Sequence, residues 1–167
     1  PAAAQSAQLE FDSNINSPFQ ELSPVISSDG SLLFFCREGS PQNVGYKQRK
    51  QDQDIWMSRR EANGSFGSPE HLDAPFNTAG YDFPVAFFSE SQTLYLGNTY
   101  SPDGKSAPGI SRSRLVDGKF IFPEALVIED FYNEVSLVAY SMSADQKTLI
   151  MSLKRRDTRG NSDLYVS

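Results

Sequence analysis

Short apolar runs separated by polar turns dominate this chain, and the pattern predicts β-strands throughout. In the segment 24–35, the apolar run around Val25 meets a Ser-Asp-Gly-Ser turn and is followed by Leu-Leu-Phe-Phe. Asp-Gly between two apolar runs is a strong hairpin signal, because glycine takes the positive φ that tight turns need. β-branched and aromatic runs broken by Gly, Pro, Asn and Ser leave no credible helix, so the sequence predicts an all-β protein.

The hairpin pattern occurs three times. Asp29, Glu90 and Asp145 each stand in a turn, and each is followed four residues later by a leucine that opens an apolar triplet. We interpret these acids as turn formers. Among the strand residues that follow them, six at equivalent positions are predicted to be buried: Phe34, Phe35, Leu94, Leu96, Leu149 and Met151.

Other segments recur at matching positions within the repeat. Segment 54–58 reads Asp, apolar, aromatic, apolar, Ser, and so does 163–167, whereas 109–113 in the middle copy has lost the acid. Segments 64–72 and 118–126 share Gly-x-Phe followed by Pro-Glu, and each is read as a fourth strand. Each unit therefore holds four short strands in meander order, which is typical of β-propeller blades. The third unit is expected to reach only its third strand, at 163–167.

The repeat resembles the WD40-like repeat of TolB-like propellers, in which a proline, Ser-x-Asp-Gly, an apolar pair and Asp-Ile-Tyr recur in each blade. It is similar to the envelope form found in Bacteroidetes-type bacteria, often joined to an OmpA-like peptidoglycan-binding domain. The resemblance covers about 11–167 and implies a periplasmic or outer-membrane-associated propeller. The chain departs from the pattern at 89–91 and 145–146, where Ser-Glu-Ser and Asp-Gln replace Asp-Gly.

The repeat also divides the chain. We expect a flexible N-terminal segment at 1–8, a β-propeller domain at 9–167, a spare fourth strand at 9–11, and blades at about 22–72, 83–126 and 137–167. Three blades are fewer than the four to eight of known propellers. The chain is therefore interpreted as a partial propeller. It would be half of a six-bladed ring closed by the remainder of a precursor, or a half closed by a second copy of the chain.

The composition limits the kinds of partner that are expected. The 167 residues suit one domain with a real core, and no run approaches the roughly 20 apolar residues of a membrane helix. The net charge of −6 argues against a nucleic-acid partner. Cys36 is the one cysteine and is interpreted as a buried apolar residue. The Ala-rich start at 1–7 fits either the end of a secretory signal or a linker.

The sequence offers little for catalysis or metal binding. His71, the one histidine, stands where the second unit has alanine, which favours a structural position. The alternating acids at 51–54 resemble part of a calcium loop but lack its remaining carboxylates and its glycine. Asp54 and Asp163 are instead expected to accept hydrogen bonds from loop backbone. We predict no catalytic residue, no metal site and no cofactor.

Trp56 and Tyr165 occupy matching places, and both are predicted to pack between blades. The loops between second and third strands vary most, and in a meander they emerge on the same face as the segments between units. That face is the candidate binding face, although a solvated charged rim is the alternative interpretation. Its predicted residues are Asn16, Tyr46, Lys47, Arg49, Lys50, Asn77, Tyr100, Asn133, Lys154, Arg155 and Arg156.

Two functional hypotheses remain. The first is a non-catalytic binding or scaffolding module of the bacterial envelope that contacts protein or cell-wall glycan. The alternative is the propeller portion of a glycoside hydrolase or peptidase whose catalytic groups lie outside this chain. The lack of a nucleophile with its base, and of a paired-carboxylate signature, favours the first. The basic loop residues predict an acidic or anionic partner.

Overall fold

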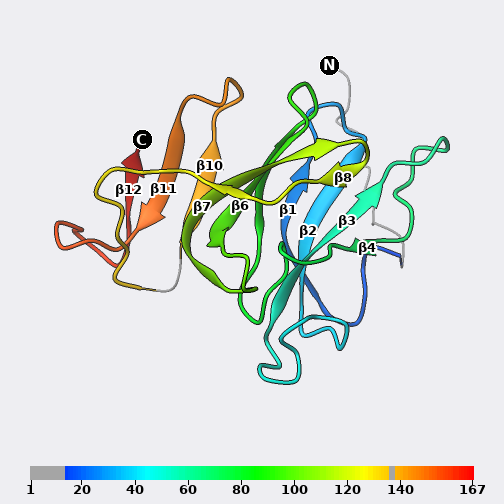
Figure 1. Cartoon of the computed structure of the whole chain (residues 1–167), viewed down its shortest axis with the longest axis horizontal. Coiled ribbons are helices and arrows are strands. Elements are labelled where there is room, and N and C mark those ends of the chain that lie inside the picture. Colours follow the sequence, from blue (N-terminus) through cyan, green and yellow to red (C-terminus); the bar gives the residue numbers. More distant parts are fainter. Residues whose placement is uncertain (1–13, 136–137) are drawn as a thin grey trace, which may run out of the picture.

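A computed structural model describes residues 14–135 and 138–167, which form three antiparallel sheets (Figure 1). The expected segments at 1–8 and 9–11 lie outside the described residues. Those residues contain strands and no helix, so the predicted all-β class is confirmed. The strands of each sheet follow one another along the chain, as in a meander.

The first sheet has the predicted four strands, the second has five, and the third has three, as expected for a unit that reaches only its third strand. The first contains β1 (Gln20–Ile26), β2 (Leu32–Glu38), β3 (Gln53–Arg59) and β4 (Glu70–His71). The second contains β5 (Pro84–Phe88), β6 (Thr93–Tyr100), β7 (Ser106–Val116), β8 (Lys119–Phe120) and β9 (Glu124–Ala125). The third contains β10 (Ala139–Met142), β11 (Leu149–Leu153) and β12 (Asp163–Val166).

In the second sheet, segment 118–126 forms two short strands, so the prediction of a single fourth strand there was wrong. Asp117 and Gly118 both adopt positive φ, 50° and 75°, as a two-residue hairpin turn requires. This turn folds β8 back onto the end of β7, and β9 then pairs separately with β7 at Ser111 and Arg112.

The first and third hairpin turns are built alike. The Ser27 hydroxyl donates to Asp29 Oδ1 over 2.6 Å, and the Ser143 hydroxyl donates to Asp145 Oδ1 over 2.6 Å. Each serine oxygen also accepts a backbone amide from the residue five positions later, at 2.8 and 3.0 Å. The predicted turn-forming role of these two acids is therefore confirmed.

Consecutive residues of β2 face opposite sides of the first sheet and are buried on both. Phe34 faces the second sheet, where its ring centroid lies 5.2 Å from that of Phe87. Its neighbours Leu33 and Phe35 face the other way and pack with Trp56. Burial on both faces is what the apolar triplet in this strand predicts.

The second and third sheets repeat this arrangement. Leu94 and Leu96 of β6 face the first sheet, whereas Tyr95 between them packs against the third sheet with Leu149 and Met151. All six predicted core residues are buried, so that prediction is confirmed. In each pair of neighbouring sheets, the middle residue of one triplet meets the outer residues of the next.

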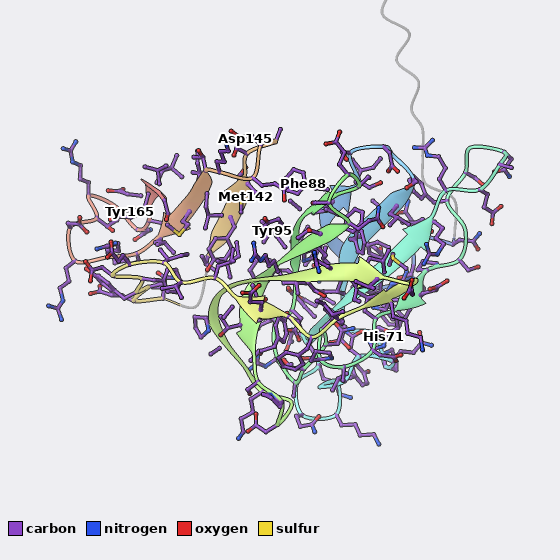
Figure 2. All side chains as sticks on the ribbon, turned by 45° about the horizontal axis from the view of Figure 1, so that its top comes forward. His71, Phe88, Tyr95, Met142, Asp145 and Tyr165 are labelled. Carbon is purple, nitrogen blue, oxygen red and sulfur yellow. The ribbon has the colours of Figure 1, made fainter. Side chains whose placement is uncertain are left out.

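Polar and aromatic side chains complete the contact between the second and third sheets (Figure 2). The Tyr95 hydroxyl in the second sheet donates to Gln146 Oε1 before β11 over 3.2 Å, and Phe88 of the same sheet packs edge to face on the Tyr95 ring at 5.8 Å. Tyr165 is part of this contact, which confirms its predicted packing between units. Trp56 lies on the face of the first sheet that points away from the second, where the described residues include no neighbouring sheet, so for Trp56 packing between units stays a prediction.

The first strands of the three sheets lie side by side. β1 contacts β5, and β5 contacts β10. Pro24, Val85 and Ala139, one residue from each of these strands, line a common cleft of about 240 Å³. The sheets are thus joined both through their faces and along their first strands.

We expect Phe35→Ala to lower the free energy of unfolding by about 3–5 kcal/mol, because Phe35 is only 2% exposed and alanine leaves a cavity. Ile150→Ala is the control in β11, where the side chain is 43% exposed, and it is expected to cost less than about 1 kcal/mol. Urea unfolding followed by tryptophan fluorescence measures both. Equal costs would contradict the burial pattern described here.

Candidate functional site

One end of the sheets carries the loops that join second to third strands. The antiparallel register places Gln20, Glu38 and Gln53 in one row at this end of the first sheet. The loops 39–52, 101–105 and 154–162 leave the sheets here, and we call this end the loop face. The turns that hold Asp29 and Asp145 lie at the opposite end, at the top of Figure 1.

Loop 39–52 is fastened to β3 by polar side chains. Asp54 Oδ2 accepts the Val44 amide over 2.7 Å, and Asp52 Oδ2 accepts the Gly45 amide over 2.6 Å. The Asn43 side chain donates to the Asp52 carbonyl oxygen over 2.7 Å. The predicted acceptance of loop backbone by Asp54 is confirmed. So is that by Asp163, which accepts an amide from loop 154–162 over 2.9 Å.

The same loop presents basic and aromatic side chains to solvent. Lys47, Arg49 and Lys50 are all exposed. Lys50 Nζ lies 3.7 Å from the centroid of the Tyr46 ring, and the Arg49 guanidinium lies 4.7 Å from that of Tyr81. Aromatic rings attract cations placed over their faces, so these contacts order long side chains at the surface. The structure therefore gathers four of the predicted residues into one patch.

A cleft of about 510 Å³ opens beside this patch. Its lining comes from the first and second sheets and from the start of the third: Leu22, Ser23, Glu38, Gln53, Tyr81, Phe83 and Val138. Ser23 adopts a φ of 50° in a bulge of β1, a conformation rarely taken by residues other than glycine, asparagine or aspartate. Sequence reasoning did not find this cleft, because it forms only when β1 and β5 lie side by side.

Loop 154–162 is built around Arg155. Its guanidinium lies between the rings of Tyr132 and Tyr165, 4.6 and 5.0 Å from their centroids. Asn133 Oδ1 accepts the Lys154 amide over 2.8 Å, which ties this loop to the preceding segment. Lys154 is half-buried and Arg156 is exposed. Arg155 thus holds the loop together, whereas Arg156 is the predicted residue of this loop that is exposed to a partner.

Two predicted face residues lie inside the protein. Asn77 is buried, accepts the Ile55 amide through Oδ1 over 2.6 Å, and donates to the Leu72 carbonyl oxygen over 2.6 Å. Tyr100 is buried at the end of β6, and burial raises the pKa of its hydroxyl. The loop face therefore exposes fewer of the predicted residues than expected. Asn16 is exposed.

Buried acids below the loop face were not among the predicted site residues. Asp52, Asp54 and Asp82 are fully buried, and burial raises the pKa of both Asp52 and Asp82 to about 6. Asp82 accepts hydrogen bonds from both the amide and the hydroxyl of Thr78, at 2.6 and 2.9 Å. Residues two apart in an extended segment share one face. The acids at 52 and 54 were therefore the sequence feature that could have indicated this buried acidic cluster.

His71 is engaged by the same cluster. Its Nε2 lies 2.6 Å from Asp54 Oδ2, and its ring packs 4.8 Å from that of Trp56. This arrangement fixes β4 against β3 and is consistent with a structural role. Cys36 is buried in β2, and burial raises the pKa of its thiol, as expected for an unreactive apolar residue.

Within residues 14–135 and 138–167, no group of three or more His, Cys, Asp or Glu side chains is arranged to hold a metal ion. The same residues include no helix with the length and apolar character needed to cross a bilayer. The chain matches no protein-family model and no curated protein.

We expect Asn77→Ala to lower the free energy of unfolding by about 1–3 kcal/mol, because it leaves buried backbone groups of Ile55 and Leu72 without partners. Asn161→Ala, at an exposed position of loop 154–162, is the control and is expected to change it by less than about 0.5 kcal/mol. Thermal and urea unfolding measure both variants. A neutral Asn77→Ala would show that this residue does not hold β3.

Proposed function

We propose that the three sheets are consecutive blades of a β-propeller, and that the chain is a non-catalytic binding or scaffolding module of the bacterial envelope. Its loop face would contact an anionic partner, a protein segment or a cell-wall glycan. The observation that carries the proposal is that the first strands lie side by side while the variable loops leave the sheets at one end. In propellers the innermost strands surround a central channel and the loops form its mouth.

The repeated packing of neighbouring sheets supports the propeller. The middle residue of the β2 triplet, Phe34, faces the second sheet, and the middle residue of the β6 triplet, Tyr95, faces the third. If each further sheet packs on the preceding one in this same way, enough sheets close into a ring. The matching residue of β11, Ile150, is 43% exposed and faces no sheet among the described residues.

An apolar face on the third sheet supports closure by a further element. Leu164 and Val166 are 76% and 72% exposed, and Val166 pairs with Ile150. Apolar residues gathered on one exposed sheet face favour association. The remainder of a longer precursor or a second copy of this chain would cover them.

The charge of the loop face supports an anionic partner. The whole chain carries a net charge of −6, yet Lys47, Arg49, Lys50 and Arg156 are exposed on this face. Their aromatic neighbours add surfaces that suit a partner with apolar or sugar groups. The envelope location rests on the resemblance of the repeat to envelope propellers.

Binding is favoured over catalysis by the role of His71. This histidine is held by Asp54 at 2.6 Å and packs on Trp56, so its position is explained by the first sheet alone. The hydrolase alternative would draw its catalytic groups from outside this chain.

To test the loop face, we would reverse two exposed charges with Lys47→Glu and Arg156→Glu together. The matched control is Arg59→Glu with Lys147→Glu, which makes the same change in net charge at the opposite end of the sheets. We expect the first pair to weaken binding to poly-glutamate or to purified peptidoglycan sacculi at least about tenfold, and the control to bind as the parent chain does.

Titration calorimetry and co-sedimentation measure the two interactions. Equal weakening by both pairs would mean that only net charge matters, and a parent chain that binds neither probe would contradict the proposed anionic partner.

To test closure, we would compare Leu164→Asp with Val127→Asp, whose parent side chain is 96% exposed outside the sheets. We expect the parent chain and Val127→Asp to self-associate as concentration rises and Leu164→Asp to remain monomeric, because an acid on the apolar face opposes its burial. Multi-angle light scattering gives the masses. Identical masses for all three proteins would contradict an associating face.

A further inference from the structure

Asp52 and Asp54 form a buried carboxyl pair beneath loop 39–52. Both side chains are fully buried, and the two carboxyl groups lie within hydrogen-bonding reach of each other. Their Oδ2 atoms are occupied by loop amides, Gly45 for Asp52 and Val44 for Asp54. Their Oδ1 atoms are also buried and have no hydrogen-bond partner among the described residues.

Two ionised carboxylates in contact and away from water repel each other, so one of them takes up a proton unless a cation is present. A proton on one carboxyl group turns that group into a donor for the other, so a hydrogen bond joins the two where two ionised groups would repel. We propose that Asp52 and Asp54 share one proton, which fastens loop 39–52 to β3, and that loss of this proton loosens the loop.

The groups around the pair explain why the proton is held. In the segment before β5, the charge of Asp82 raises the pKa of Asp52 further. On β4, His71 Nε2 lies 2.6 Å from Asp54 Oδ2, which also accepts the Val44 amide, so Asp54 is the acceptor of the pair and Asp52 carries the proton. Cys36 of β2 is uncharged there, because burial raises the pKa of its thiol. No lysine or arginine side chain forms an ion pair with either carboxyl group among the described residues.

The direction of the pH dependence follows from these surroundings. Burial is the main cause that raises the pKa of Asp52 from 3.8 to about 6, and the Gly45 amide opposes it. A group whose pKa is higher in the folded state contributes stability that is complete below its unfolded pKa. That contribution is lost as the pH rises through about 6. The loop is therefore expected to be tightest in acid and looser at neutral pH.

The loosened segment is the one that carries Lys47, Arg49 and Lys50. If the proposed function of the loop face holds, the order of its basic patch therefore depends on pH. The shared proton itself does not depend on that function, and it is tested without any partner.

The test is amide hydrogen exchange of Val44 and Gly45 between pH 5 and 7.5, corrected for intrinsic exchange rates. In the parent chain we expect the protection of both amides to fall by about tenfold or more as the pH rises. In Asp52→Asn we expect no such fall, because an asparagine amide can donate to the Asp54 carboxylate and does not titrate. Asp52→Asn with the parent's pH dependence would overturn the proposal.

Two controls identify the titrating group. His71→Gln removes the other side chain near the pair that ordinarily changes charge between pH 5 and 8, yet can still donate to Asp54. Asp82→Asn removes the neighbouring buried acid, whose pKa burial also raises to about 6. Loss of the pH dependence in this variant would assign the effect to Asp82 and overturn the shared proton. Both controls are expected to keep the parent's pH dependence. Its loss in His71→Gln would assign the effect to the histidine and overturn the shared proton.

Carboxyl carbon NMR of the parent chain gives a readout that does not depend on any variant folding. One carboxyl group of the pair is expected to titrate near pH 6, and titration of both below about pH 4.5 would overturn the proposal. Calcium is the final arm. If adding calcium at pH 7.5 restores the protection of Val44 and Gly45, a bound cation rather than a proton joins the two carboxylates, and the proposal fails.

Discussion

The structure depends on strands that are buried on both faces. Phe34 and Tyr95 point one way from β2 and β6, while their neighbours in sequence point the other way, so each of these strands contributes to two hydrophobic clusters. A full face-to-face contact on both sides requires a sheet or other cover on each side. This requirement fixes the order of the sheets and brings β1, β5 and β10 side by side.

The loop face follows from the same arrangement. In the first sheet, β1 begins at the same end at which loop 39–52 joins β2 to β3. The loop and the cleft beside Tyr81 are therefore held by the first residues of β1 and β3. The buried acids then make the position of the loop dependent on polar bonds rather than apolar packing, since Asp54 and Asp52 bind its amides. Such bonds respond to protonation in a way that apolar contacts do not.

Much of the fold could be predicted because its determinants are local. The serine–acid pairs that close the turns at Asp29 and Asp145 lie two residues apart in the sequence, and the apolar triplets encode burial on both faces. The second and third turns are less obvious, because residues other than glycine adopt positive φ there, Gln92 at 50° and Gln146 at 60°. In these two turns the packing of the flanking strands determines the backbone conformation.

The site was harder to predict because its parts come together only in three dimensions. Asn77 reads like a surface loop residue, yet it replaces a missing backbone partner for β3. Arg155 reads like an exposed cation, yet two tyrosines enclose it. The cleft beside Tyr81 draws on all three units. Only the exposed basic loop around Lys47 could be recognised from its own composition.

The central claim is that consecutive sheets pack with alternate residues of each triplet on opposite sides. Nuclear Overhauser spectroscopy on the chain with labelled aromatic rings and methyl groups tests it most directly. We expect cross-peaks from the Phe34 ring to Phe87 and Leu94 and from the Tyr95 ring to Leu149, and none from Phe35 to the second sheet. Cross-peaks from Phe35 to Leu94, without those from Phe34, would contradict it.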